Sequence, residues 1–129
     1  MNLLLDTNVL VAVARKRSDD LGAAIRTALA DSKNAFFVSA ASLWEIAIKT
    51  RLGKLDPELP LEELAGYFEA LGMAMLAVDH RHAVVQADPE PAMRNLFDRM
   101  LLAQCAVENM KLLTTDGALS SHPLSWRAA

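Results

Sequence analysis

Two aspartates in this sequence stand where a short apolar run ends. In the stretch LLLDTNVL, residues 3–5 lead directly into Asp6, and in LLTTDGAL the leucines at 112–113 are followed two threonines later by Asp116. Ligands of open α/β sheets bind in the crevice beyond the carboxyl ends of the strands, so both carboxylates could reach one crevice if their strands are near neighbours. Taken alone, each aspartate could be an ordinary cap, and Thr-Asp-Gly at Asp116 is also common turn chemistry.

Asp98 begins a helical pattern that is apolar on most of its circumference. The residues that share its face by helical spacing are Leu101, Leu102, Cys105 and Asn109. The opposite side carries Leu96, Met100, Ala103 and Val107, so we expect this helix to be central. A carboxylate buried there must be paired or bind a metal. The alternative is that Asp98 caps the helix or pairs with Arg94.

Glu45 lies in the stretch SLWEIAIK, where it shares a helix face with Ser42 and Lys49. Glu45 and Lys49 have the i,i+4 spacing of an ordinary ion pair on a helix surface. By itself this pattern indicates a solvated salt bridge. Only together with the other three acids does Glu45 indicate a functional site.

Together the four acids predict a site for a hard cation, because carboxylate oxygens are the ligands that Mg²⁺ and Mn²⁺ prefer. Such a site can activate water and stabilise an in-line displacement at phosphorus. His80 and His82 are two residues apart and do not share a helix face, and His122 lies in the tail. The five glycines are scattered and form no phosphate-binding loop, so zinc and P-loop sites are not expected.

Apolar runs alternate with helical patterns along the chain, which predicts an α/β fold with a parallel sheet. Thr7 or Asn8 is expected to cap the first helix, with Ser39 and Asn95 capping two later ones. The expected strands cover residues 2–6, 35–40, 73–78 and 111–115, and the tail residues 124–128 could add an edge strand. The expected helices cover residues 8–15, 21–30, 40–53, 61–71, 80–87 and 96–109.

The chain has 129 residues, of which 53% are hydrophobic and 22% charged, as in a globular protein. We expect a single domain over 1–129. No apolar run is long enough to span a membrane, and the N-terminus lacks the pattern of a signal peptide.

The one cysteine, Cys105, makes a reducing, cytoplasmic compartment the expectation. A net charge of −3 argues against binding nucleic acid by charge alone, although a bound metal can reverse the local sign.

The stretches LLLDTNVL, SAASLWEIAIKTRLGKL and LFDRMLLAQCAVENMKLLTTD occur together in this order. In order and spacing they resemble PIN-domain proteins, and in particular the VapC-type toxins of bacterial toxin–antitoxin pairs. The resemblance implies a three-layer α/β/α sandwich around a mainly parallel sheet. It also implies Mg²⁺- or Mn²⁺-dependent endoribonuclease activity on RNA, neutralised by a small cognate antitoxin. The metal-binding and catalytic acids would be Asp6, Glu45, Asp98 and Asp116.

The resemblance further places polar supporting residues at Asn8 and Thr115, where they would orient carboxylates or waters. Lys49 is expected to offset part of the negative charge. The chain departs from the family pattern at residues 93–96, which read MRNL where relatives often carry His-x-Asp-Pro. It departs again after Asp116, where Gly117 and Ala118 replace a basic pair.

The acidic residues also allow two other functions. A non-catalytic module could use the acidic pocket to capture a basic segment of a partner, but keeping Asp98 buried for that purpose alone is costly. A phosphoryl-accepting receiver domain would need paired acids after the first strand and a lysine after a late one, and neither is present. In the toxin reading, a basic residue of the antitoxin would fit the acidic crevice. Leucines and methionines around 61–76 would suit a homodimer face.

Overall fold

The computed structural model describes residues 1–87, 89–90 and 95–128. Four strands form one sheet with the order β3-β2-β1-β4, and every neighbouring pair is parallel. The strands are β1 (Asn2–Leu5), β2 (Ala35–Ser39), β3 (Ala74–Leu76) and β4 (Lys111–Leu113). The α-helices are α1 (Thr7–Ala14), α2 (Ala23–Ala30), α3 (Ala40–Arg51), α4 (Leu64–Ala70), α5 (His80–Val84), α6 (Leu96–Glu108) and α7 (Gly117–Ser120).

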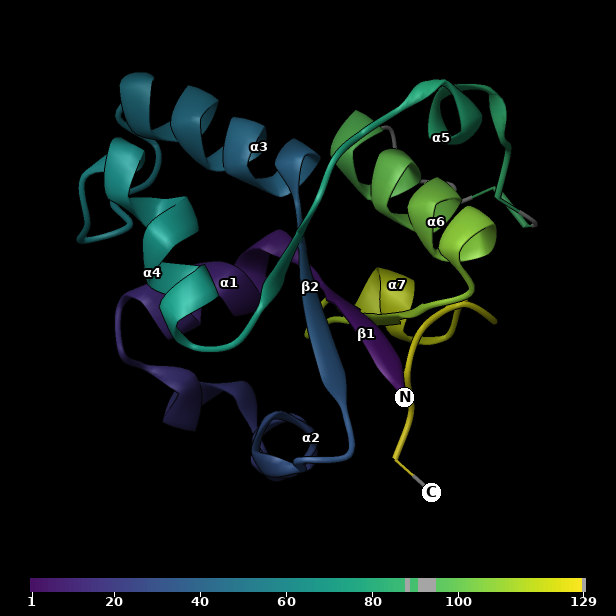
Figure 1. Ribbon diagram of the computed structural model, residues 1–129, viewed down its shortest axis with the longest axis horizontal. Helices are drawn as coiled ribbons and strands as arrows, with labels where there is room; N and C mark the ends of the chain where they lie inside the picture. Colours follow the sequence, from purple (N-terminus) through teal and green to yellow (C-terminus); the bar gives the residue numbers. More distant parts are fainter. Residues whose placement is uncertain (88, 91–94, 129) are drawn as a thin grey trace.

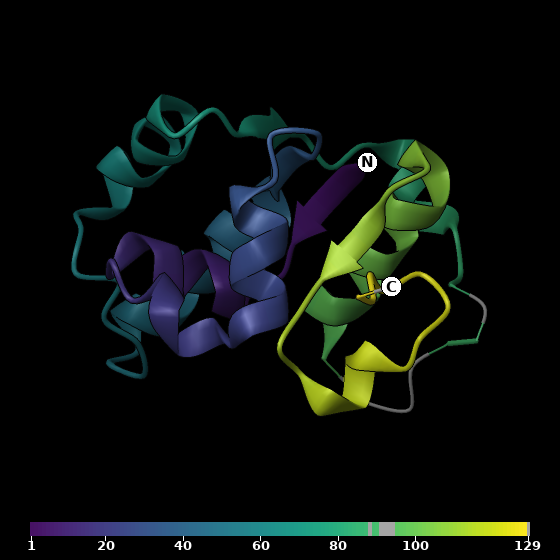
Figure 2. The same cartoon turned by 90° about the horizontal axis from the view of Figure 1, so that it is seen from below.

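Helices cover both faces of the sheet, which confirms the expected α/β/α arrangement (Figures 1 and 2). Side chains alternate between faces along a strand, so Leu3 and Leu5 of β1 enter one core while Leu4 enters the other. The first core includes residues of α1, α2 and α4, and the second is formed mainly by α6 and the C-terminal segment. Strand β1 lies inside the sheet between β2 and β4, and its three leucines are fully buried.

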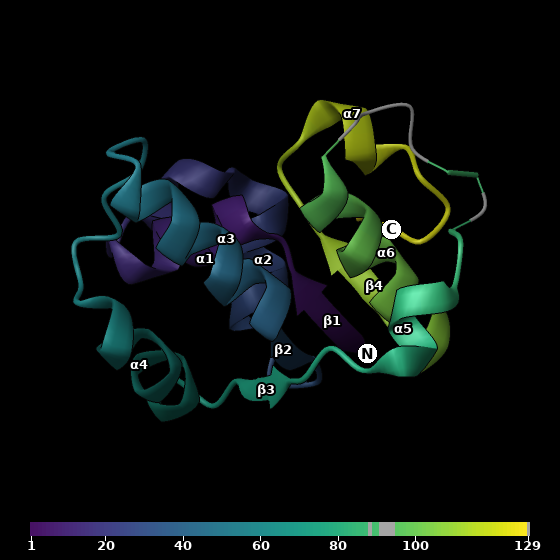
Figure 3. The same ribbon diagram turned by 90° about the horizontal axis from the view of Figure 1, so that it is seen from above.

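Helix α3 starts where β2 ends and contacts both α1 and α6 (Figure 3). Ser39 caps it as expected, because Ser39 Oγ accepts a hydrogen bond from the Ala41 amide at 3.0 Å. Gly53, with φ 72°, follows the last turn in the left-handed conformation that commonly ends a helix. The expected Asn95 cap of α6 is also confirmed, with Asn95 Oδ1 accepting from the Phe97 amide at 3.0 Å.

Several expected elements differ in detail. The cap of α1 is Asp6 and not Thr7 or Asn8. Gly22, with φ 88°, separates a 3₁₀ turn at Ser18–Leu21 from α2, and a second 3₁₀ turn at Leu61–Glu63 precedes α4. The expected helix 80–87 ends already at Val84. The tail forms α7 and a single parallel bridge between Ser125 and Leu112, not a full edge strand.

Two expectations about apolar surfaces hold only in part. Helix α6 is buried on the side of Leu101, Leu102 and Cys105, whereas Leu96 is largely exposed and Met100 only partly buried. The segment 61–76 does not present a row of exposed leucines and methionines, since Leu64 and Met73 are buried in the first core. Leu71 is the large apolar residue that this segment leaves exposed. All helices in the part of the chain that the structure describes are too short or too polar to cross a membrane.

The central position of β1 leads to a stability prediction. Leu4→Ala should lower the free energy of unfolding by about 2–5 kcal/mol, because it opens a cavity between β1 and α6. Leu71→Ala is the matched control, since the same change at a side chain 52% exposed should cost less than about 0.5 kcal/mol. Urea unfolding of both variants measures the difference. Equal losses would contradict the assignment of Leu4 to the core.

Candidate active site

The pairing of β1 with β4 brings the two strand-end aspartates to the same edge of the sheet. Leu5 is in register with Leu113, and the Asp6 amide continues the ladder by donating to the Leu113 carbonyl at 2.9 Å. Asp6 and Asp116 therefore follow neighbouring strands, which is the condition under which the sequence predicted that they meet.

Asp6 is held through both of its carboxylate oxygens. Oδ1 accepts from the Thr7 amide at 2.8 Å, and Oδ2 accepts from the Thr114 hydroxyl at 2.6 Å. The residue is only 3% exposed, and this burial raises the pKa of the Asp6 carboxyl, an effect that Glu45 and Asp116 reinforce and the two hydrogen bonds oppose. Asp6 thus caps α1 and also belongs to a cluster of acids.

Glu45 comes from the middle of α3 and is 4% exposed. Its Oε1 accepts from the Thr7 hydroxyl at 2.7 Å, and its Oε2 accepts from Lys49 Nζ at 2.6 Å. The expected i,i+4 ion pair with Lys49 is present. It is not an ordinary surface pair, because the Glu45 side chain is buried. The Lys49 side chain is 42% exposed, so its ammonium group reaches the buried carboxylate of Glu45 from the solvent side.

Asp98 lies in the first turn of α6 and is 5% exposed. Beside it, the rings of Phe97 and Trp44 meet edge to face with centroids 5.7 Å apart, which fixes the start of α6 against α3. Burial raises the pKa of Asp98 to about 7, and the charges of Asp6, Glu45 and Asp116 add to this shift. The predicted alternative partner, Arg94, lies outside the described residues.

Asp116 is the least buried of the four acids. Its Oδ1 accepts from the Ala118 amide at 2.8 Å and so caps α7, and its own amide donates to Thr114 Oγ1 at 2.9 Å. The turn-and-cap interpretation is therefore correct for Asp116. Its charge also raises the pKa values of both Asp6 and Asp98, which places it in the same electrostatic cluster.

The polar residues that support the acids differ from the expected ones by one position each. Asn8 and Thr115 are exposed, and neither side chain makes a hydrogen bond within the described part of the chain. Their neighbours Thr7 and Thr114 make these contacts, and Ser42 lies 3.1 Å from the Thr7 hydroxyl. The signal for Ser42 was present, because it precedes Glu45 by three residues on the same helix face.

The donor set fits a hard divalent cation. All four acidic groups are carboxylates, and burial raises the pKa values of Asp6 and Asp98, with repulsion from the neighbouring acids adding to both shifts. A cation placed among them would relieve that repulsion and find the oxygen ligands that Mg²⁺ and Mn²⁺ require.

Among the described residues, the group of acids and histidines whose ligand atoms lie close enough together for one metal ion is a different one, between α5 and α6. Asp79, His82 and Glu108 offer ligand atoms within 4.8 Å of one another. Their hydrogen bonds are already made: His82 Nδ1 accepts from the Asp79 amide, and His82 Nε2 donates to Glu108 at 2.7 Å. Arg81 bridges Asp79 and Glu108 and holds the pKa of Asp79 down at about 2. This cluster docks α5 on α6.

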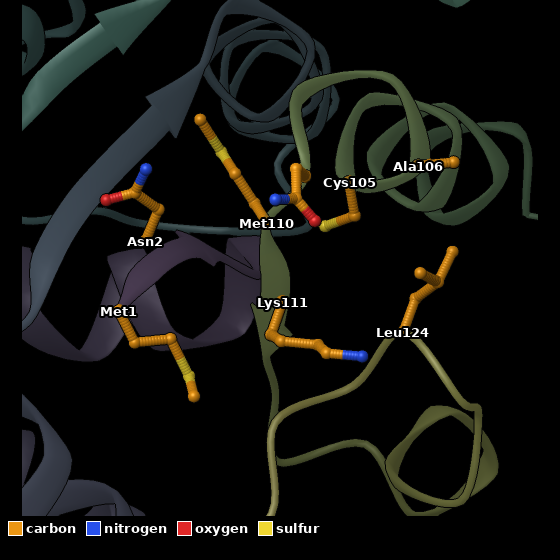
Figure 4. Close-up of a pocket in the computed structure, with 8 residues that line it drawn as sticks. Met1, Asn2, Cys105, Ala106, Met110, Lys111 and Leu124 are labelled. Atoms are coloured by element: carbon orange, nitrogen blue, oxygen red, sulfur yellow. The ribbon is translucent and has the colours of Figure 1, made fainter.

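A hollow at the opposite end of the strands includes Met1, Asn2 and Lys111, the last of which begins β4 (Figure 4). Cys105 also lies there, and burial raises the pKa of its thiol to about 12. The thiol is therefore protonated at neutral pH and does not act as a nucleophile. Cys105 thus packs as a small buried apolar group.

The parallel sheet, with helices on both faces and acids beyond the strand ends, places the protein among the α/β proteins whose ligand site lies at the carboxyl edge of the sheet. The chain belongs to the PIN domain family, whose model matches residues 3–123. It is 43% identical over 58 residues to Ribonuclease VapC16 of Mycobacterium tuberculosis. That match covers 44% of this chain and 41% of the relative, so the chain spans less than half of that protein's length.

The fold is similar to that of a solved chain from the crystal structure of VapBC2 from Rickettsia felis bound to a DNA fragment from their promoter. The TM-score is 0.58, and the similarity covers 97% of this chain and 96% of that chain. Sequence identity is 14%, so this likeness concerns the fold alone.

The raised pKa of Asp98 predicts how stability depends on pH. The folded protein binds a proton at Asp98 with a pKa of about 7, whereas the ordinary value of 3.8 applies after unfolding. Between these values the folded state holds more protons, so the free energy of unfolding should rise as the pH falls from about 8 to about 5. Urea unfolding in the presence of a chelator measures this trend.

Asp98→Asn is the control for this measurement, because asparagine does not titrate. Comparing the two proteins isolates the titration of Asp98 together with its coupling to the neighbouring acids. The variant should show a flatter profile than the parent between about pH 5 and pH 8. Identical profiles would show that the fold does not raise the pKa of Asp98.

Proposed function

We propose that this protein is a metal-dependent endoribonuclease of the VapC type, which cleaves RNA phosphodiester bonds with Mg²⁺ or Mn²⁺. The observation that carries the proposal is the meeting of four carboxylates from β1, α3, α6 and β4 at one sheet edge. Membership of the PIN domain family supports it, as does the partial match to a protein named a ribonuclease.

The chemistry divides between the cation and the chain. A bound Mg²⁺ or Mn²⁺ would polarise a water and stabilise negative charge at the phosphorus that is attacked. Asp6, Asp98 and Asp116 would hold the cation, and Glu45 would orient water beside it. Thr7 and Thr114 keep Glu45 and Asp6 in place through the hydrogen bonds described above.

The proposal includes two protein partners, an antitoxin and a second copy of this chain. A small antitoxin would neutralise the enzyme by placing an arginine or lysine of a basic segment among the four carboxylates. A guanidinium can satisfy two carboxylates through its planar fork and would compete directly with the cation. Homodimerisation is also proposed, with the exposed apolar groove at Trp44, Val78 and Leu96 as its candidate face in place of 61–76.

The central test is RNA cleavage by the purified protein. Cleavage should require Mg²⁺ or Mn²⁺ and stop in excess chelator, while Ca²⁺ should support it poorly because its looser coordination positions water badly. Asp6→Asn should abolish cleavage, because it removes one anionic ligand. Without metal, the melting temperature of Asp6→Asn should be higher than that of the parent, because asparagine still caps α1 while one repelling charge is lost.

These outcomes separate catalysis from binding alone. Full activity in chelator would refute the metal mechanism, and retained cleavage by Asp6→Asn would leave Asp6 as a helix cap only. A parent that binds Mn²⁺ but cuts no RNA under any condition would favour the non-catalytic binding module.

Lys49 generates a separate prediction, because it neutralises Glu45 from the solvent side. Lys49→Ala should weaken cleavage modestly, by roughly threefold, since the ion pair is half exposed. Lys49→Glu should cause a severe loss, because it places a fifth carboxylate beside the other four. Lys54→Glu is the matched control with the same charge change at an exposed position. Equal cleavage by the two glutamate variants would make Lys49 an ordinary surface residue.

A further inference from the structure

One residue, Thr7, touches two of the four acids through different groups. Its amide donates to Asp6 Oδ1 at 2.8 Å, and its hydroxyl donates to Glu45 Oε1 at 2.7 Å. Asp6 ends β1, whereas Glu45 lies in α3, so the two carboxylates belong to elements that are distant in sequence. Thr7 is the first residue of α1 and is itself buried.

The hydroxyl of Thr7 has a defined direction. A threonine hydroxyl carries a single proton, and the nearer charged acceptor, Glu45 Oε1, takes it. The contact with Ser42 Oγ at 3.1 Å must then use the proton of Ser42. The hydrogen bonds therefore run from Ser42 to Thr7 and from Thr7 to Glu45, and Ser42 is fully buried as well.

The other oxygen of Glu45 is held differently. Its partner Lys49 has a long side chain that is 42% exposed, so that contact can follow a moving carboxylate. Thr7 has a short, β-branched side chain with few rotamers, and it starts a helix fixed by the Asp6 cap. Of the two contacts, only the one from Thr7 can fix where the Glu45 carboxylate lies.

We propose that Thr7 is the positioning residue that sets the placement of Glu45 relative to Asp6, through its hydroxyl and its amide. The inference rests on the proposed metal site but concerns a residue that does not itself hold the cation. Without the hydroxyl, Glu45 would remain tied only to Lys49 and would turn towards solvent. The cation would then lose a correctly placed carboxylate or the water that this carboxylate orients.

The test is the affinity of the full chain for Mn²⁺ alone, measured by calorimetry with no RNA present. Thr7→Val preserves the shape of the side chain and removes the hydroxyl, and it should weaken Mn²⁺ binding by about tenfold or more. Thr7→Ser restores a donor and should bind within about threefold of the parent. Parental affinity in a folded Thr7→Val protein would overturn the proposal.

Thr50→Val is the matched control for the chemical change. Thr50 lies one helical turn and a half beyond Glu45 on α3, and its buried hydroxyl has no hydrogen-bond partner among the described residues. Removing that hydroxyl should leave Mn²⁺ affinity unchanged. A loss in Thr50→Val as large as that in Thr7→Val would show that any buried hydroxyl near α3 matters, and would also overturn the proposal.

A double-mutant cycle shows whether Thr7 acts through Glu45. If it does, Thr7→Val combined with Glu45→Gln should bind Mn²⁺ no more weakly than Glu45→Gln alone. Additive losses would contradict this coupling. If Thr7→Val does not fold, the Ser42→Ala variant provides the test. It should weaken Mn²⁺ binding by roughly threefold, and parental affinity in this variant would count against the proposal. Failure of the parent to bind Mn²⁺ would instead refute the proposed function.

Discussion

The structure depends on one constraint, which is the repulsion among four carboxylates gathered at one edge of the sheet. Three of them, Asp6, Glu45 and Asp98, are at most 5% exposed, so water screens their charges poorly. Burial raises the pKa of Asp98 to about 7, and the charges of Asp6, Glu45 and Asp116 add to that rise, so the fold leaves the repulsion in place. A cluster of this kind is a cost to folding, because burial and mutual repulsion both disfavour the charged carboxylates.

The parallel topology makes the cluster possible. In the order β3-β2-β1-β4, the acids that follow β1 and β4 become neighbours although 110 positions separate Asp6 from Asp116 in the chain. The helices that follow the strands begin at the same edge, so α3 brings Glu45 to the end of β1. Helix α6 packs in the second core and contacts α3, where Phe97 and Trp44 meet edge to face beside Asp98.

The sequence predicted the strands, the sheet class and the strand-end aspartates, because buried apolar runs that end in a carboxylate are a local signal. It did not predict that Thr7 and Thr114, and not Asn8 and Thr115, contact the acids. A shift of one residue turns a side chain to another side of the backbone, and a sequence without coordinates does not fix that register. The burial of Leu64 depends on which helix covers it, which is likewise a tertiary property.

Helix N-termini explain how the fold tolerates the cluster. Asp6 and Asp116 cap α1 and α7, and Asp98 lies in the first turn of α6, so three of the four negative charges stand where free amides and the helix dipole favour an anion. Glu45 is the exception, because it lies in the middle of α3, and it is the acid that is paired with a lysine. Cap and ligand are therefore not competing roles for Asp6. Each of its oxygens accepts one hydrogen bond and keeps a second lone pair, so the bonds that start α1 also hold a carboxylate ready for a cation.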